Sequence, residues 1–486
     1  MNPREAETVT VARARLRGPE GTPLESRSWW LREALGADPG TPCPPLAESL
    51  RPDVAIVGGG YTGLWTAFHL KKADPGADVV VLEADICGGG PSGRNGGFMY
   101  GLWEDFQGMV DLFGVQGAVR VGDASERAVD LAEGIFRDAG IDIWFRRSGH
   151  LNVSTSPIFD DSVEEYRRLK SREGFPSDMF QLLSAAEVAE RCRSAQFRGG
   201  VLQTRGATVQ PARLVRGLRA LVLGLGVRIF EATPVTCVEG GTRVRITTPG
   251  GEVSAEQAVL AINAWSNQIP EFRRSIIPRA SHIVMTEPAP DRLRELGWTG
   301  GEGIGDFRAT VHYLRTTPDG RIAFGAGTGS SARGVNRRMS KDPSWYRRLE
   351  TTLHTWFPEF RDVRIDGEWG GPIDLSAHHV PFFGSMWNGN VHYGMGFTGG
   401  GVGPCVLAGQ ILSSLLLGRQ DEFSSLPLVG YRPKSFPPEP FLSIGARLTL
   451  EAILRTDDAW EAGKPGNPVL KTLARLPRRL GYSLGH

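Results

Sequence analysis

Apolar residues are arranged along this chain in two ways, as short continuous runs and at the spacing of a helix. Residues 53–57 and 78–82 are short apolar runs that predict buried strands. Between them Leu64, Ala67 and Leu70 recur at helical spacing. This order predicts a strand–helix–strand unit near the start of the chain.

The same two patterns continue to about residue 418 and predict a mixed α/β fold. Alternation predicts a hairpin over 141–155, several strands over 227–266 with the last ending at Ala264 to Ser266, and a strand over 276–288. A second hairpin is expected across Pro318, Asp319 and Gly320, and another strand over 390–396. Helices are expected over residues 102–140, 162–173, 184–193, 211–223, 344–357 and 404–417.

Glycines between the first strand and the first helix predict a nucleotide site. Gly58, Gly60 and Gly63 fit G-x-G-x-x-G, which allows the turn, close approach of a pyrophosphate and tight packing of the helix. Tyr61 and Thr62 lie at the expected helix start, where amides and the helix dipole meet phosphate. Glu83, followed by Ala84, ends the second strand and suits the two ribose hydroxyls of an adenosine.

A second glycine-rich loop follows directly, over residues 87–97. Ser92, Arg94 and Asn95 are its polar groups, and Gly96 and Gly97 end it. The stretch resembles the second flavin-contacting loop of the D-amino-acid oxidase, glycine oxidase and sarcosine oxidase family. A flexible surface loop is the alternative interpretation.

A third glycine cluster precedes the helix expected at 404–417. Such a helix start can favour negative charge on a reduced flavin, although an ordinary turn before a core helix would look similar. The stretch resembles the closing flavin motif of the same family, and the two ends together indicate FAD rather than NAD alone. The residues concerned are Phe397, Thr398, Gly399, Gly400, Gly401 and Val402.

Composition excludes several function classes. The 486 residues carry 55 Lys and Arg against 54 Asp and Glu, so no global field recruits nucleic acid. The five cysteines are widely spaced and form no C-x-x-C motif, which argues against both a metal site and a disulfide framework. Their pattern favours a cytoplasmic protein. The sequence contains no run of about 18 apolar residues, so stable membrane insertion is not expected. A homo-oligomer is left open.

The resemblance implies a Rossmann-like FAD-binding domain interleaved with a mixed, largely antiparallel substrate domain. It also implies backbone contacts to the adenine end of the flavin near Val235. The expected divisions are an N-terminal arm (1–50), the FAD-binding domain (51–105, 200–268 and 365–420), the substrate domain (106–199 and 269–364) and a C-terminal extension with a helical tail (421–486).

Within the family, the W-G-G at 369–371 and the Y-x-R at 313–315 are most similar to the amine-oxidising branch typified by γ-glutamylputrescine oxidase. Three cations of other branches are replaced, by Ile373, Gly403 and Ala323. The first two would hold a substrate carboxylate and the third would assist dioxygen. Their replacement predicts a substrate that lacks an α-carboxylate.

The resemblance therefore implies FAD-dependent oxidation of a C–N bond in a small primary or secondary amine, giving an imine that hydrolyses, with dioxygen as the expected electron acceptor. Two alternatives remain: a glycine, sarcosine or D-amino-acid oxidase with a different carboxylate clamp, for which Arg315 is the candidate, and a non-catalytic flavoprotein subunit. The expected substrate-pocket residues are Tyr313, Arg315, Trp369 and one of the adjacent His378 and His379, which would face opposite sides of a strand-like run.

The two termini carry separate expectations. Trp29 and Trp30 lie on a short expected helix that would cover the main body, with a dimer contact or a substrate entrance as alternatives. The basic tail, residues 464–486, is expected to be a solvated terminus, with an amphipathic helix docked on a partner or an anionic membrane as the alternative.

Overall fold

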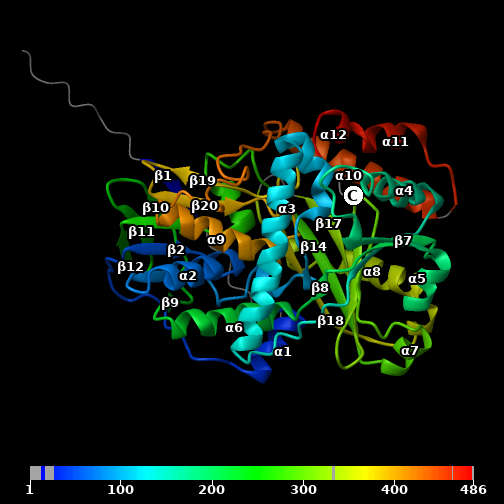
Figure 1. Cartoon of the computed structure of the whole chain (residues 1–486), viewed down its shortest axis with the longest axis horizontal. Coiled ribbons are helices and arrows are strands. Elements are labelled where there is room, and N and C mark those ends of the chain that lie inside the picture. Colours follow the sequence, from blue (N-terminus) through cyan, green and yellow to red (C-terminus); the bar gives the residue numbers. More distant parts are fainter. Residues whose placement is uncertain (1–11, 17–26, 331–333, 462, 484–486) are drawn as a thin grey trace, which may run out of the picture.

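The computed structural model describes residues 12–16, 27–330, 334–461 and 463–483. Within these ranges the strands form four sheets. Figure 1 shows the two large ones side by side, with the six-stranded sheet around β2 (Val54–Val57) on the left and the eight-stranded sheet around β14 (Ile277–Thr286) on the right. None of the helices in the described part of the chain is long and apolar enough to cross a membrane.

The six-stranded sheet is built around the expected strand–helix–strand unit. In spatial order the strands are β19 (Phe382–Met386), β20 (Val391–Met395), β13 (Gln257–Leu260), β2 (Val54–Val57), β3 (Val79–Leu82) and β9 (Arg228–Phe230). Five of these strands run parallel to one another, and the edge strand β19 pairs antiparallel with β20. All residues of β2 and β3 are buried, as the continuous apolar runs predict.

Three helices pack on this sheet. They are α2 (Tyr61–Ala73), α6 (Pro211–Gly224) and α9 (Pro404–Leu416). Their buried faces join one apolar core with α3 (Phe106–Asp138), which is kinked at Gly114. The helices α2 and α9 lie next to each other although more than 300 residues separate them, so the two expected glycine-rich helix starts meet.

The eight-stranded sheet is mixed, with one parallel pair among antiparallel neighbours. Its strands, in spatial order, are β18 (Ile365–Leu375), β14 (Ile277–Thr286), β17 (Ile322–Ser330), β16 (His312–Thr316), β15 (Gly303–Asp306), β5 (His150–Ser154), β7 (Gly199–Gln203) and β6 (Phe180–Ser184). The strand β18 and all of β7 except Gly199 fall within ranges expected for the FAD-binding domain, yet both strands lie in this sheet. The family resemblance gave interleaving but not the sheet to which each strand belongs.

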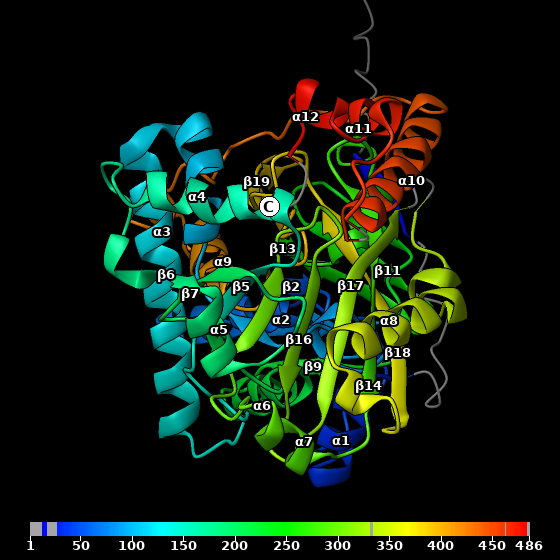
Figure 2. The ribbon, with the colours of Figure 1, turned by 90° about the vertical axis from the view of Figure 1, so that its right-hand side faces the viewer.

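Side chains on this sheet alternate between two faces. On one face Val284, Leu314 and Phe324 pack against α8 (Pro343–Trp356). On the other face Ile283 and Ala323 pack against α1 (Trp29–Ala37). Figure 2 shows β14, β16 and β17 from the side of α8.

The N-terminal arm is fastened to the body. Trp30 is fully buried, with its ring centre 6.1 Å from that of Trp369 on β18, and the guanidinium of Arg321 lies 4.9 Å from the ring of Trp29. Ser28 donates to the carbonyl of Gly93 at 2.5 Å. The tryptophans therefore cover the main body, as expected.

Smaller elements complete the fold. A four-stranded sheet contains β1 (Arg13–Arg15), β10 (Cys237–Glu239), β11 (Val244–Thr248) and β12 (Gly251–Ala255), and a two-stranded one contains β4 (Phe98–Met99) and β8 (Ala207–Thr208). The short helices α4 (Asp160–Leu169), α5 (Ala185–Arg191) and α7 (Pro290–Glu295) lie beside the eight-stranded sheet.

Two expectations are corrected. The hairpin over 141–155 does not form, because β5 pairs instead with β7 and β15, strands that lie elsewhere in the sequence. The strand expected to end at Ala264 to Ser266 ends at Leu260, and Asn263–Gln268 is a 3-10 helix.

The C-terminal extension is helical through α10 (Phe441–Glu461), α11 (Pro468–Ala474) and α12 (Leu476–Arg479). Asp457 of α10 is buried, and Asp458 pairs with Arg348 of α8, so α10 is part of the body. The helices α11 and α12 bury none of their residues. The basic tail is therefore a pair of short surface helices up to residue 483.

Candidate functional site

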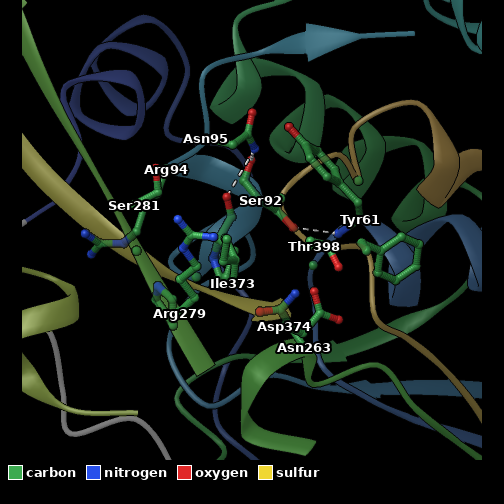
Figure 3. A pocket seen from close by; sticks show the side chains of 18 of the residues that line it. Tyr61, Ser92, Arg94, Asn95, Asn263, Arg279, Ser281, Ile373, Asp374 and Thr398 are labelled. Atoms are coloured by element: carbon green, nitrogen blue, oxygen red, sulfur yellow. Dashed lines mark hydrogen bonds between the residues drawn. The ribbon is translucent and has the colours of Figure 1, made fainter. Parts of the chain in front are cut away.

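One cavity of about 1620 Å³ reaches from the glycine-rich turns to the inner face of the eight-stranded sheet. This volume exceeds that of a typical small-molecule site and suits a dinucleotide together with a substrate. Of the expected cofactor residues, those that line it are Gly58, Gly60, Tyr61, Thr62, Glu83, Ala84, Ser92, Arg94, Asn95, Gly96, Val235, Phe397, Thr398, Gly399, Gly400, Gly401 and Val402. Gly63 and Gly97 lie outside its wall. Figure 3 shows Tyr61 and Thr398 on one side and Arg279 and Ser281 on the other.

The first turn has the geometry that its glycines predict. Gly58 has φ +109°, and a Cβ there would lie 2.4 Å from the carbonyl oxygen of Ala261. A Cβ at Gly63 would lie 2.0 Å from the Gly58 oxygen, so this glycine serves the packing of α2 rather than the cavity surface. The amides at the start of α2 are thereby held against the cavity.

Glu83 accepts hydrogen bonds from the amide of Gly59 (2.7 Å) and from the amide of Asp85 (2.9 Å). It lines the cavity at the end of β3. Burial is the main cause that raises the pKa of Glu83, to about 7. Ribose hydroxyls could donate to this carboxyl group and favour its ionised form.

The second glycine-rich loop is tied to the first turn. The Ser92 hydroxyl accepts from the amide of Tyr61 at 2.9 Å. Asn95 donates to the carbonyl of Ser92 (3.0 Å) and accepts from the amide of Gly97 (2.8 Å), which fixes the bend of the loop. Arg94 donates to the carbonyl of Gly89 at 2.8 Å, so its charge serves partly to shape the loop.

The closing loop has the left-handed backbone that glycine favours. Thr398 has φ +54° and Gly399 has φ +93°. Asp374 accepts from the amide of Gly396 at 2.6 Å, and the Thr62 hydroxyl lies 3.2 Å from the sulfur of Cys405. The two glycine-rich helix starts therefore border the same space.

Two buried oxygens test whether this space suits FAD. Asp374 Oδ1 and Asn263 Oδ1 accept no hydrogen bond from any described residue, and both residues line the cavity. Burial raises the pKa of Asp374 to about 6. Buried acceptors of this kind need donors, which the hydroxyl groups of a dinucleotide can supply. The amides, the acidic ribose site and these acceptors together fit FAD.

The inner face of the eight-stranded sheet forms the opposite wall. The Tyr313 hydroxyl lies 2.5 Å from the Ser281 hydroxyl, which donates to the carbonyl of Ala326 at 2.9 Å. Tyr313 therefore donates to Ser281 and keeps a lone pair that can accept. Burial raises the pKa of Tyr313, which keeps this phenol neutral.

Two of the expected substrate residues, Arg315 and Trp369, lie outside the cavity wall. Arg315 is buried two residues beyond Tyr313, where it donates to the carbonyls of Val209 and Gly97 and lies 5.5 Å from the ring of Trp30. Trp369 donates from its indole nitrogen to the carbonyl of Arg94 at 2.8 Å. Both side chains hold the second glycine-rich loop from behind.

The adjacent histidines do not lie on a strand. The strand β18 ends at Leu375, and His379 has φ +59° in the turn that follows. His379 lines the cavity, whereas His378 hydrogen-bonds to the hydroxyl of Tyr431 outside it. The turn, not strand alternation, separates the two side chains.

The positions of the replaced cations are also resolved. Ile373 lines the cavity, Ala323 packs beneath α1, and a Cβ at Gly403 would lie 2.3 Å from the Tyr100 oxygen. An aliphatic side chain therefore occupies the position at which the family resemblance would place the arginine of the glycine-oxidase branch.

The sequence analysis missed several cavity residues. The signal for Arg279 and Ser281 was present, since they are polar residues two positions apart in a largely apolar strand and therefore share one of its faces. No comparable signal marks the others, because they lie on loops or on strands whose pairing was not predicted. These residues are Glu104, Asp105, His150, Asn152, Asn263 and Asp374.

Comparison with known proteins agrees with this site. The chain is 30% identical over 420 residues to γ-glutamylputrescine oxidoreductase of Escherichia coli K12, which covers 85% of this chain and 95% of the relative. It is 24% identical over 374 residues to glycine oxidase of Bacillus licheniformis, covering 76% and 94%.

The fold is similar to that of glycine oxidase from Geobacillus kaustophilus, with a TM-score of 0.64 at 19% identity over 79% of this chain and 99% of that one. It is also similar to L-proline dehydrogenase from P. horikoshii, with a TM-score of 0.63 at 19% identity over 78% and 96%. Residues 53–415 match the family of FAD dependent oxidoreductases named DAO. The chain belongs to this DAO family and is an FAD-dependent oxidoreductase.

Proposed function

We propose that this enzyme oxidises the C–N bond of a primary or secondary amine that lacks an α-carboxylate, giving an imine that water hydrolyses. FAD, when bound, supplies the hydride acceptor. The protein must therefore bind the amine without water, hold its α-carbon in place and accept the proton that the ammonium loses. No protein nucleophile is required.

The observation that carries this proposal is the free acceptor on Tyr313. Its hydroxyl proton is directed to Ser281, so its oxygen can accept a hydrogen bond from the substrate nitrogen. The ring of Phe98 lies 5.7 Å from the ring of Tyr313, and this aromatic wall attracts a cation while it excludes water. A neutral amine is the form that can release a hydride.

Carboxylates beside β5 in the cavity wall support a cationic substrate. Glu104 and Asp105 line the cavity, and Glu104 accepts from the side-chain amide of Asn152 on β5 at 3.0 Å. Negative charge in a partly desolvated cavity raises the local concentration of ammonium ions. The wall therefore favours amines over neutral alcohols.

The absence of an α-carboxylate is inferred from Ile373. The aliphatic side chain of Ile373 offers no charge and no hydrogen-bond donor to an α-carboxylate at that position. The alternative of an α-amino-acid oxidase that uses Arg315 is disfavoured, because Arg315 is buried behind the loop and bonded to two carbonyls.

Anaerobic reduction of the bound flavin tests the proposal. Amines without an α-carboxylate should bleach the flavin absorbance, and glycine, sarcosine and D-alanine should bleach it at least about tenfold more slowly. Faster reduction by the α-amino acids, or no reduction by any amine, would contradict it. In air, stoichiometric hydrogen peroxide would identify dioxygen as the electron acceptor.

A further inference from the structure

Exposed apolar side chains are concentrated on the C-terminal helices. Among the residues that the structure describes, eight large apolar side chains are exposed, and six of them lie between Phe441 and Leu480. Val469 is 73% exposed, whereas the two that lie elsewhere, Leu131 and Ile158, are 38% and 37% exposed. The six residues, called the C-terminal surface below, are Phe441, Ile444, Leu448, Val469, Leu476 and Leu480. Such a concentration of exposed apolar side chains marks a surface that contacts a partner or a membrane.

On α10 the exposed apolar residues share one face. Phe441, Ile444 and Leu448 recur at intervals of three and four residues, which places them on one side of the helix. The side chains that α10 buries, among them Leu442 and Ile453, lie on another side. The apolar face is therefore the one that α10 turns away from the protein body.

The two tail helices repeat this arrangement. The amides of Arg475 and Arg479 donate to the carbonyls four residues before them, so helical turns continue from α11 into α12. Val469, Leu476 and Leu480 are seven and four residues apart and therefore lie on one side of these turns. Since α11 and α12 bury none of their residues, this side stays uncovered.

The apolar residues of α10 and of the tail are held beside each other. Tyr482, just after α12, stacks on Phe436 at 5.4 Å, and both pack with Leu442 at the start of α10. Lys471 of α11 lies 5.9 Å from the ring of Trp460 near the other end of α10. The tail therefore runs alongside α10 in the opposite direction. Figure 2 shows α11 and α12 at the top of the molecule with α10 beside them.

The charge carried by the tail is positive. Residues 463–483 contain five Lys and Arg and no Asp or Glu, although the formal charge of the whole chain is only +1. Arg475, Arg478 and Arg479 are exposed, and no ion pair joins them to an acidic residue of the described chain. The tail therefore presents uncompensated positive charge next to its apolar side chains.

The acidic residues of α10 do not neutralise this charge. Asp458 pairs with Arg348 of α8, and Glu461 pairs with Arg308, so both carboxylates are used in fastening α10 to the body. Glu451 pairs with an arginine of α10 itself. The tail is therefore free to attract an anionic surface.

We infer that the C-terminal surface binds the protein to an anionic phospholipid bilayer, with the apolar side chains in the interface and the arginines beside lipid phosphates. Apolar and basic residues side by side on short surface helices are typical of segments that lie in the plane of a membrane interface. A second copy of the chain is disfavoured, because symmetric pairing would bring the arginines of two tails together. None of the six apolar residues lines the FAD cavity, so membrane binding does not depend on the substrate.

Vesicle binding of the holoenzyme tests this surface. The full chain is mixed with vesicles of phosphatidylcholine, either alone or with about one-third phosphatidylglycerol, and the flavin that floats with the vesicles is measured. Binding to the anionic vesicles should be at least about tenfold tighter, and it should fall at least about fivefold in ~0.5 M salt. Equal binding to the two kinds of vesicle, or binding to neither, would overturn the inference.

Two double variants separate the apolar and the charged contributions. Leu476→Ser with Leu480→Ser should weaken binding to anionic vesicles at least about tenfold. Arg475→Gln with Arg479→Gln should weaken it about tenfold to thirtyfold, since each charge near the bilayer contributes roughly fivefold. Because these side chains are exposed, both variants should keep the FAD content and melting temperature of the wild type.

Matched substitutions elsewhere on the surface serve as controls. Leu131→Ser with Ile158→Ser removes two exposed apolar side chains, and Arg51→Gln with Arg361→Gln removes two exposed charges. Both should change vesicle binding less than about threefold. Binding that survives in the tail variants, or falls equally in the controls, would overturn the inference.

Sedimentation velocity without vesicles distinguishes the other occupant. The wild type should show the same oligomeric state as Leu476→Ser with Leu480→Ser at every protein concentration. Self-association that grows with concentration and disappears in this variant would assign the C-terminal surface to a second copy of the chain and overturn membrane binding.

Discussion

The two ends of the cavity are built from different materials. The cofactor end is formed by backbone amides and glycines from three short loops, each next to a helix or strand end. The proposed substrate end is formed by side chains that project from β14 and β16 and from the loop residues beside them. Backbone geometry at the first end tolerates little change, whereas single side chains at the second can be exchanged without altering the fold. Substitutions at the two ends should therefore differ in what they abolish.

The largest effect is expected for Gly58→Ala. The new Cβ would lie 2.4 Å from the Ala261 oxygen, at a φ that L-residues rarely adopt, so the turn must open. We expect the purified protein to be colourless, with FAD affinity reduced at least about a hundredfold. The ratio of absorbance at the flavin band to that of the protein measures this. Gly36→Ala, on α1 with no atom within 4 Å of the new Cβ, is the control and should remain yellow. Full flavin content in Gly58→Ala would contradict the account of the turn.

Trp369→Ala tests whether an aromatic residue of β18 serves the cofactor end. Its indole donates to Arg94 of the second loop and packs on Trp30. We expect a loss of about 3–5 kcal/mol in the free energy of unfolding and partial loss of FAD. Thermal unfolding with flavin fluorescence measures both quantities. If the variant keeps its melting temperature and FAD but is reduced more slowly by amines, Trp369 acts on substrate instead.

Tyr313→Phe is the matching test of the substrate end. Only the acceptor oxygen and its bond to Ser281 are lost, so FAD content should not change, whereas amine-dependent flavin reduction should slow about tenfold to thirtyfold. Stopped-flow reduction under anaerobic conditions gives the rate. Tyr482→Phe, which removes a hydroxyl bonded to the Ser435 carbonyl outside the cavity wall, should leave the rate unaltered. A parallel loss of FAD in Tyr313→Phe would argue against a division between the two ends.

The smallest expected effect is a pH dependence at the cofactor end. Burial raises the pKa of Glu83 to about 7, and hydrogen bonds from ribose hydroxyls favour the ionised form. FAD affinity should therefore rise by about tenfold from pH 6 to pH 8 and level off above that. In the FAD-free protein the stability of the fold changes with pH in the opposite direction. The raised pKa of Glu83 stabilises the fold at low pH, and this contribution is lost as the pH rises through about 7.

Equilibrium titration of the apoprotein with FAD at several pH values measures this dependence. Glu83→Gln should bind FAD more weakly at pH 8 and with a flatter profile. The same slope in Glu83→Gln as in wild type would assign the pH dependence to another group.

The difference between the two ends also explains what sequence could predict. Gly58 and Gly60 predict a turn, because the local backbone geometry requires glycine. The strand, turn and helix also follow one another directly in the chain, so their order could be predicted from the sequence. The side chain of Arg279 reaches the cavity only because β14 lies between β18 and β17, strands whose pairing is not local. Arg315 and Trp369 were expected in the substrate pocket, but the loop and α1 cover their part of the inner face. Sequence alone could not show which segment covers which part of a sheet.

The fastening of α1 has a consequence for biosynthesis. Trp30 leaves the ribosome before its buried partners Ile283 and Trp369, which belong to strands made much later. The loop that Ser28 grips is likewise made before the strands that support it from behind. The nascent chain therefore cannot complete its flavin pocket until translation has passed β18. Until then, Trp29 and Trp30 have no surface on which to pack and remain exposed to solvent.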